Sequence, residues 1–259
     1  MKWHRLSAMV YRDFLITARL KWKFIELVYL PITTVLIWGL FAVYARSFSA
    51  EAGALLLVIN VFWAFAHLTQ STTNQNMMED VWSGSLKQLF FSGITEFEYL
   101  FSRIISTTII TCVVAALMLG LSFYFGITAI AANISAFVAF SVIILIASIS
   151  LSILVASLIF VMGREYGFLS WAAIQIFILL SAPFFPVEIF PTALQYVAQI
   201  MPFTDVFTAI RLLIETGVLH TDLMAKGTII SAAYFFISLP LYKMAFKRAK
   251  KTGKLVRMS

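Results

Sequence analysis

The chain has 259 residues, of which 61% are hydrophobic and 12% are charged, and its mean hydropathy is +0.95. This composition excludes an ordinary soluble globular protein. The formal net charge is +7, and the basic residues that produce it gather at the two ends. Between them lie six apolar runs, each about as long as the roughly 20 residues that a membrane-crossing helix needs. The runs are residues 24–44, 53–71, 101–125, 134–162, 166–185 and 228–246.

These runs predict a single all-α polytopic membrane domain over residues 1–259, with a core of six transmembrane helices in residues 24–246. The runs are long and unbroken, which favours helices over strands. Cys112 is the only cysteine, so no intrachain disulfide can form. The three histidines, His4, His67 and His220, lie far apart in the sequence and predict no metal site.

The first 23 residues are charged and have helical periodicity, but they lack the short apolar core of a cleavable signal peptide. Four basic residues share one stripe of this helix: Arg5, Arg12, Arg19 and Lys23. With Trp3 and Trp22 as anchors, the pattern predicts an amphipathic helix in the cytoplasmic membrane interface. The alternative interpretation is a simple polybasic topology signal.

The charge distribution predicts the orientation in the membrane. Residues 1–23 hold six basic residues and one acid, and residues 243–259 hold seven basic residues and no acid. The two tails therefore carry +12, and the rest of the chain carries −5. Because basic segments stay on the cytoplasmic side, both termini are expected there, including the basic tail of residues 247–259. The flanking membrane runs make anionic lipid, not nucleic acid, the expected partner of this charge.

The second run changes from apolar to polar along its length. Four polar residues share one helical face: Asn60, His67 and Ser71 within the run, and Asn74 just after it. Such a stripe is typical of a substrate pathway, but it also suits hydrogen bonding between helices, and both interpretations remain open. The ionisable groups expected within the runs are essentially Glu26 and His67, and Glu26 can pair with Lys23.

A polar segment, residues 74–103, separates the second and third runs. Asn76 and Glu79 have the spacing of a capping box, which predicts a short amphipathic helix that ends at Gly93. Its apolar face comprises Trp82, Leu86, Leu89 and Phe90. Thr95 and Glu98 then predict the start of a helix of about 30 residues. The short helix suits either lipid headgroups or a protein partner, and Gly84 within it suggests close approach of another backbone.

The fifth run ends in a proline-rich stretch, where Pro183, Pro186 and Pro191 interrupt any regular helix. Helix starts are predicted near Thr192 and Thr204, the second of them ending near Gly217. Residues 187–218 therefore predict two short helices at the outer surface, which form a re-entrant hairpin. Its charged residues are expected to satisfy one another or face water: Glu188, Asp205, Arg211 and Glu215.

The chain lacks the residues of a self-contained enzyme or ion-coupled carrier. Its sequence has no Walker A loop, no Ser–His–acid set and no Gly-rich dinucleotide turn. Buried carboxylate relays and internal inverted repeats are also missing from the pattern. No catalytic residue is therefore predicted, and the energy for any active transport must come from another chain.

Two motifs resemble those of the membrane subunits of ABC-2 type transporters. The first is EDVWSGSLKQLFFS at residues 79–92, which lies between the second and third runs and is similar to the acidic-x-x-x-G-[ST]-L stretch of that family. The second is FFPVEIFP at residues 184–191, followed by Pro202 and Arg211. The likeness extends to the six-span layout and the interfacial helix, and so covers the whole chain.

The resemblance implies that residues 79–92 contain a cytoplasmic coupling helix that docks on a separate ATPase. The implied coupling residues are Glu79, Asp80, Trp82, Gly84, Leu86, Lys87 and Leu89. The implied outer-hairpin residues are Pro183, Pro186, Glu188, Pro191, Pro202 and Arg211. It also implies two copies of the permease, identical or different, and two ATPase subunits that bind ATP and Mg, with no cofactor in this chain.

The sequence thus predicts a multi-pass permease in the cytoplasmic membrane that exports an amphipathic or lipid-linked cargo. That class includes glycolipids and polysaccharides, lipids and hydrophobic drugs. An ATP-independent channel or carrier is one alternative, and an integral-membrane enzyme is another. A partner ATPase distinguishes the first hypothesis from both.

Overall fold

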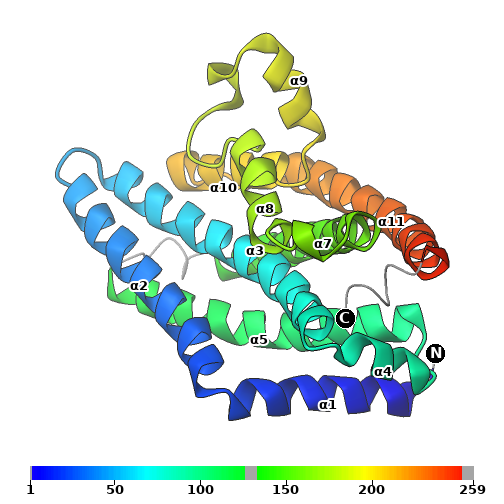
Figure 1. Ribbon diagram of the computed structural model, residues 1–259. Helices are drawn as coiled ribbons and strands as arrows, with labels where there is room; N and C mark the ends of the chain where they lie inside the picture. Colours follow the sequence, from blue (N-terminus) through cyan, green and yellow to red (C-terminus); the bar gives the residue numbers. More distant parts are fainter. Residues whose placement is uncertain (1, 126–132, 253–259) are drawn as a thin grey trace.

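A computed structural model describes residues 2–125 and 133–252, apart from the side chains of residues 22–24, 26, 30, 50 and 51. Over these ranges every regular element is a helix and there is no strand (Figure 1). The α-helices are α1 (Trp3–Arg19), α2 (Lys21–Ala45), α3 (Ala50–Trp82), α4 (Ser85–Phe91), α5 (Glu96–Tyr124), α7 (Ile134–Met162), α8 (Leu169–Leu180), α9 (Thr192–Ile200), α10 (Thr204–Thr216) and α11 (Thr221–Lys251). Two short 3-10 helices are η1 (Arg164–Tyr166) and η2 (Val187–Ile189).

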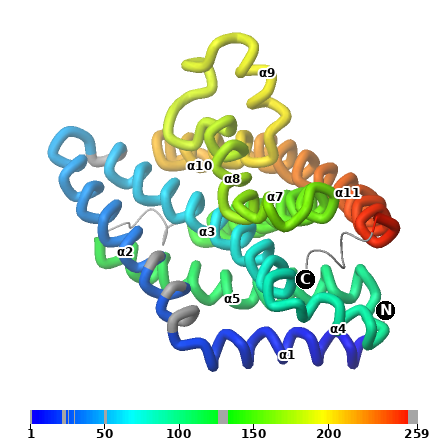
Figure 2. Tube along the Cα trace, in the orientation of Figure 1, coloured from blue at the N-terminus to red at the C-terminus, as the bar shows by residue number. Residues whose placement is uncertain are grey.

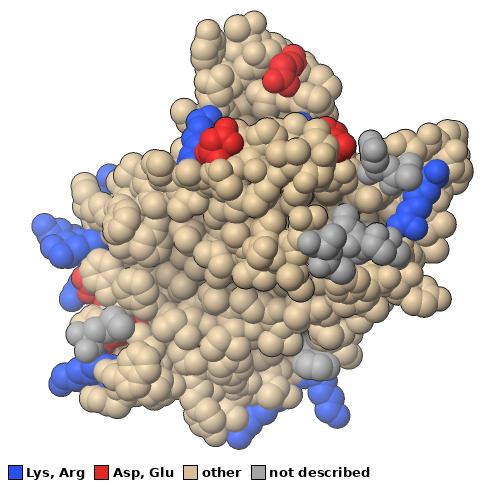
Figure 3. Space-filling view, turned by 180° about the vertical axis from the view of Figure 1, so that it is seen from behind, with Lys and Arg blue, Asp and Glu red and all other residues tan. Residues whose placement is uncertain are grey.

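Five helices in the described part of the chain are long and apolar enough to cross a membrane: α2, α3, α5, α7 and α11. The sharply bent pair α9–α10 brings the number to six if it is counted as one span. On the face seen in Figure 3, the charged side chains lie near the edges and the broad middle is uncharged. These features are typical of a multi-pass membrane protein, and they confirm the all-helical class.

The long central helix α3 differs from the prediction because it continues without a break from Ala50 to Trp82. The helix start predicted at Asn76 is therefore wrong. The polar side chains of this stretch are buried against neighbouring helices, and Asn76 itself is only 7% exposed. Packing on several sides keeps the helix going where the local capping pattern favoured a new start.

The start of α5 follows the prediction closely. The Thr95 side chain accepts a hydrogen bond from the Glu98 backbone N–H, and the Glu98 carboxylate accepts one from the Thr95 N–H, which completes the capping box. Gly93 has φ of 82°, the left-handed conformation expected of a residue that ends a helix. The resulting helix has 29 residues.

The fifth apolar run forms a much shorter helix than the predicted span of residues 166–185. Helix α8 has 12 residues, which gives a length of about 18 Å and leaves it short of a hydrocarbon core of about 30 Å. Beyond the proline-rich stretch, α9 and α10 begin at the predicted Thr192 and Thr204, and they meet at 95°.

Helix α3 lies at the centre of the molecule and packs against α2, α5, α7 and α8, while α11 runs along α7. One apolar cluster fills the space between α3, α7 and α10, with Phe62, Phe140 and Phe207 among its buried members. A second cluster lies at the other end of these helices, around Tyr99 and Tyr242. Helix α1 lies along α5 (Figure 1) and contributes the buried Met9 to the second cluster.

Helix α4, the N-terminal ends of α1 and α5, and the C-terminal end of α11 gather at one end of the molecule (Figure 2). The ring centroids of Phe90 and Phe246 are 4.9 Å apart, and the Tyr242 hydroxyl donates to the Glu96 carbonyl at 3.4 Å. Lys2 and Arg5 lie at this end through their contacts with Glu98 and Gly93, and the last turn of α11 brings three more basic residues, Arg248, Lys250 and Lys251. Arg19 lies at the opposite end of α1. The last residues of the predicted basic tail, 253–259, lie outside the described residues.

Candidate functional site

The turn between α3 and α4 depends on a glycine. Gly84 caps the N-terminus of α4 with φ of 72° and ψ of 4°, a left-handed conformation that side chains disfavour. The structure therefore explains Gly84 by its backbone conformation, and not by the close approach of another backbone in a helix interior. Because the chain turns here, Trp82 and Leu86 belong to different helices and do not share one helical face.

This backbone requirement predicts opposite effects at two glycines. Gly84→Ala is expected to lower the free energy of unfolding by about 1–2 kcal/mol, because alanine in the left-handed region is strained. Gly120→Ala is expected to raise it by about 1 kcal/mol or less, because Gly120 lies in α5 with no neighbouring atom within 4 Å of an added Cβ. Thermal unfolding of the two purified variants measures both effects. Equal changes in stability would contradict this explanation of Gly84.

The residues predicted to couple to an ATPase divide into an exposed and a buried group. Trp82 is 62% exposed, and the neighbouring Phe91, which the prediction omitted, is 88% exposed. Leu86 and Asp80 are 1% and 3% exposed, so both face the interior of this chain. The four remaining members are partly buried: Glu79, Gly84, Lys87 and Leu89. Trp82 and Phe91 are thus the exposed large hydrophobic side chains that this segment offers to a partner.

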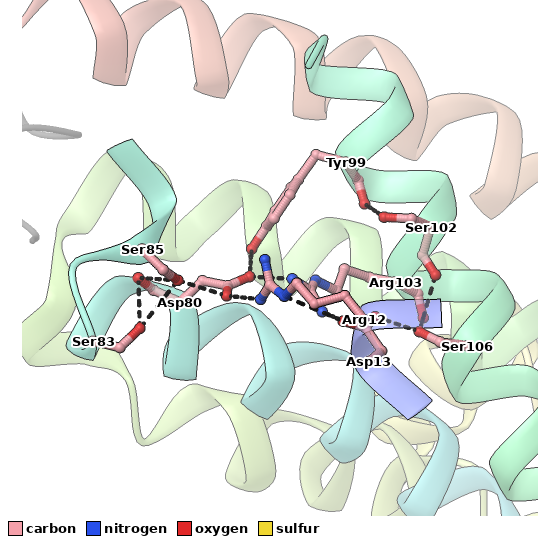
Figure 4. Close-up of polar contacts among 9 residues, drawn as sticks. All are labelled: Arg12, Asp13, Asp80, Ser83, Ser85, Tyr99, Ser102, Arg103 and Ser106. Carbon is pink, nitrogen blue, oxygen red and sulfur yellow. Dashed lines mark hydrogen bonds and ion pairs between the residues drawn. The ribbon is translucent and has the colours of Figure 1, made fainter. Parts of the chain in front are cut away.

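Asp80 belongs to a buried group of charged side chains that joins three helices. We call Asp13, Asp80 and Arg103 the charge cluster. Arg103 of α5 is 2% exposed, and its two terminal nitrogens donate separately to Asp13 of α1 and Asp80 of α3 (Figure 4). Arg12 of α1 also donates to Asp80. Two guanidinium groups therefore balance two carboxylates, as burial requires.

Hydroxyl groups complete the hydrogen bonding of both carboxylates (Figure 4). Each donor lies within 2.9 Å: Ser85 and Tyr99 donate to Asp80, and Ser106 donates to Asp13 at 2.8 Å. All four carboxylate oxygens thus accept at least one hydrogen bond. These hydrogen bonds offset the cost of burying the carboxylates, because an unpaired charge in a low dielectric is unfavourable.

Helix α1 is attached a second time near its N-terminus. The Glu98 carboxylate accepts a hydrogen bond from the Lys2 backbone N–H at 2.6 Å, and Arg5 donates to the Gly93 carbonyl. Arg5 and Arg12 were predicted to lie on a basic stripe at the membrane interface. Both instead bind groups of this chain, while Arg19 is exposed and the side chain of Lys23 lies outside the described residues.

A cavity of about 1230 Å³ extends from the charge cluster along α3, between α1 and α2 on one side and α8 on the other. Its volume exceeds that of most pockets for drug-sized molecules. Charged residues border one part of it, and aromatic residues such as Trp63 and Trp171 border the rest. The His67 ring stacks on Trp63 with ring centroids 5.6 Å apart.

The predicted polar stripe of α3 is split by the structure. His67 and Ser71 border the cavity. Asn74 instead accepts a hydrogen bond from Gln70 at 2.6 Å and donates to the Ser152 carbonyl at 2.9 Å, and so joins α3 to α7. Asn60 is buried at 2% exposure and does not border the cavity. The stripe therefore serves both a cavity wall and a helix contact.

At the other side of the bundle, Arg211 of α10 holds the segment that follows α8. One of its terminal nitrogens lies 2.8, 3.2 and 2.7 Å from the carbonyl oxygens of Ala182, Pro183 and Phe185. Arg211 thus binds carbonyls, and Asp205 binds Lys226 at 2.9 Å. Glu188 and Glu215 are exposed, as one of the two expected alternatives allowed, whereas Arg211 and Asp205 pair with groups outside the predicted set.

The prolines of this region lie where helices end. Pro183 and Pro186 lie between α8 and η2, Pro191 directly precedes α9, and Pro202 separates α9 from α10. Glu188 lies in η2 and is exposed. The breaks expected from the sequence are therefore present.

Arg103 was not among the site residues predicted from the sequence. It lies inside the third predicted run, so the expectation that ionisable groups in the runs are essentially Glu26 and His67 is wrong. An arginine in an apolar helix needs partners, and that rule was the available signal. Its partners could not be found from spacing, because Asp13 and Asp80 are distant in sequence. The side chain of Glu26 lies outside the described residues.

These features define an all-helical protein of the multi-pass membrane class, with a buried charge cluster at one end of a large cavity. Among residues 2–125 and 133–252, no three His, Cys, Asp or Glu side chains gather as a metal site. Comparison with protein-family models gives no match, and comparison with curated proteins gives none either.

Proposed function

We propose that the protein is the permease subunit of an ATP-driven exporter of the ABC-2 type. The observation that carries this proposal is the position of α4. It is a seven-residue helix between two long apolar helices; exposed Trp82 ends the preceding helix, and exposed Phe91 is the last residue of α4. A short helix with an exposed aromatic residue at each end offers a compact contact for another protein. Its sequence belongs to the first motif that resembles ABC-2 permeases.

The charge distribution supports an ATPase on the same side as α4. Basic residues at the N-terminal end of α1 (Lys2 and Arg5) and in the last turn of α11 lie at this end, which makes it the cytoplasmic end by the positive-inside rule. Both termini are then cytoplasmic. Helix α11 is 31 residues long, about 45 Å, so its start and the preceding α10 belong to the outer side.

The cavity supports an amphipathic or lipid-linked cargo. Charged groups border one part of it and tryptophan rings border another. The polar part of an amphipathic molecule can bind near the charged groups and its apolar part near the tryptophans. The working complex contains two permease chains, identical or different, and two ATPase chains that bind ATP and Mg. The surrounding membrane lipid is the remaining partner.

Purification of the protein from membranes of its own cell, with identification of bound proteins and lipids, tests this proposal. We expect an ABC ATPase in the purified complex and ATP hydrolysis by that complex. Cargo movement by the purified protein alone, without ATP, would instead favour a channel or carrier. A chemical product formed without an ATPase would favour a membrane enzyme.

The exposed residues beside α4 give a sharper prediction. Trp82→Ala and Phe91→Ala are each expected to weaken ATPase binding by more than about 1 kcal/mol, because aromatic residues dominate many protein interfaces. Tyr124→Ala is the matched control, since Tyr124 is 88% exposed at the far end of α5. Co-purification of the ATPase with each variant is measured. Equal recovery with all three variants would remove α4 and its flanks from the interface.

A further inference from the structure

The charge cluster connects parts of the chain that the proposed function places at the ATPase. Asp80 and Ser85 flank the turn into α4, Asp13 lies in α1, and Arg103 lies in α5. We propose that Arg103 is a positioning residue that locks α1 to the α3–α4 turn, so that the two move as one unit. The lock itself is a property of this chain alone, and its role in coupling rests on the proposed function.

The first argument is the geometry of the contacts. Arg103 is almost completely buried, and each of its terminal nitrogens binds a carboxylate from a different helix. Arg12 adds a second bond between α1 and Asp80. Helix α1 packs chiefly along α5, and its Met9 belongs to the apolar cluster around Leu86. The charged bonds add a directional attachment of its central turns to the α3–α4 turn.

The second argument is the cost of separation. If α1 moved away from the α3–α4 turn, Asp13 or Asp80 would lose its guanidinium partner while still poorly hydrated, which is strongly unfavourable. The forked guanidinium suits this role, because it holds two carboxylates in defined directions at once. A lysine nitrogen has no such fork and cannot bridge the two carboxylates in the same way.

The third argument is the position of the cluster beside the cavity. Asp13, Asp80 and Arg103 border it, as do Ile16 and Leu20 farther along α1. Motion delivered to α4 therefore reaches α1, and through it one wall of the cavity. Through the lock, a partner that moves α4 also moves α1, which forms part of the cavity wall.

Distance measurements between spin labels test the lock in the purified full-length protein. The labels are attached at Tyr11→Cys in α1 and Phe91→Cys in α4, both highly exposed positions, in a Cys112→Ala background. We expect one narrow distance distribution. Asp13→Leu is expected to broaden or shift it, Asp13→Asn is expected to do so less because it keeps an acceptor, and Arg103→Lys is expected to broaden it.

Asp205→Leu is the matched control. Asp205 also forms an ion pair, with Lys226, but that lysine is 53% exposed and the pair lies far from α1. We expect its distance distribution to equal that of the unsubstituted protein. An unchanged distribution in both Asp13→Leu and Arg103→Lys would overturn the lock.

The role in coupling is measured separately, with unlabelled permease bound to its ATPase. Asp13→Leu and Arg103→Lys are expected to keep ATPase binding and to lose cargo stimulation of ATP hydrolysis, measured at saturating cargo so that weaker cargo binding does not account for the loss. Full stimulation in both variants would overturn the coupling role. Absence of an ATPase from the unsubstituted complex would overturn the exporter assignment, and the spin-label distances would still decide the lock.

Discussion

Arg103→Met is expected to lower the free energy of unfolding by about 3–5 kcal/mol, the largest effect of any single substitution proposed for this chain. The variant leaves Asp13 and Asp80 buried, and Arg12 is then the remaining guanidinium beside them. Methionine fills much of the space but donates no hydrogen bond. Thermal or chemical unfolding of the purified protein in detergent measures the loss.

Two further variants show whether the buried charges cause this loss. The triple variant Arg103→Met, Asp13→Asn, Asp80→Asn removes both carboxylates and is expected to regain most of the stability, because no buried anion remains unpaired. Arg164→Met changes an exposed arginine of η1 and is expected to have almost no effect. A triple variant as unstable as Arg103→Met would show that packing, not charge, is responsible.

Arg211→Ala is expected to lower the free energy of unfolding by about 3 kcal/mol. The guanidinium lies within hydrogen-bond distance of three carbonyls between α8 and η2, and a hydrogen bond to a charged group contributes about 1.5–3 kcal/mol. Because one nitrogen donates to all three carbonyls, the stabilisation is expected to be smaller than that of three separate hydrogen bonds. The amide hydrogens of residues 181–190 should also exchange faster, which hydrogen exchange with mass spectrometry measures.

Arg211→Lys and Asp222→Ala are the controls for this prediction. Lysine keeps a cation with three donors and should retain part of the stability. Asp222→Ala removes a contact with His220 in which the side chains are 37% and 78% exposed, and it should cost about 1 kcal/mol or less. If Arg211→Ala cost no more than Asp222→Ala, the carbonyl contacts would not be holding this segment.

Elements governed by local chemistry were predictable from the sequence. Helix α7 has the predicted bounds of Ile134–Met162, because its run is uniformly apolar and Gly163 follows it. The starts of α9 and α10 follow from prolines and threonines beside them. The end of α3 was not predictable in this way, because Asn76 carries a local capping signal that burial among neighbouring helices overrides.

The candidate site depended more on contacts between distant segments. A short helix between two long helices was predicted correctly, but residues 79–82 belong to α3, and helical periodicity put Trp82 and Leu86 on one face. The left-handed turn at Gly84 separates them, and a single positive φ cannot be deduced from periodicity. Arg103 was hidden for a different reason, since only the folded chain brings α1, α3 and α5 together around it.

The charge cluster also restricts the order in which the chain is assembled. Asp13 and Asp80 are synthesised before Arg103. The bridge between α1 and α3 through Arg103 therefore cannot form until α5 leaves the ribosome. Arg103 is the eighth residue of α5, and an arginine without partners in a membrane-inserting helix costs free energy, most of all at the helix centre. The two earlier carboxylates can offset that cost as α5 enters the bilayer. The N-terminal helix is therefore among the first segments made, and its final position is decided only after the third long helix arrives.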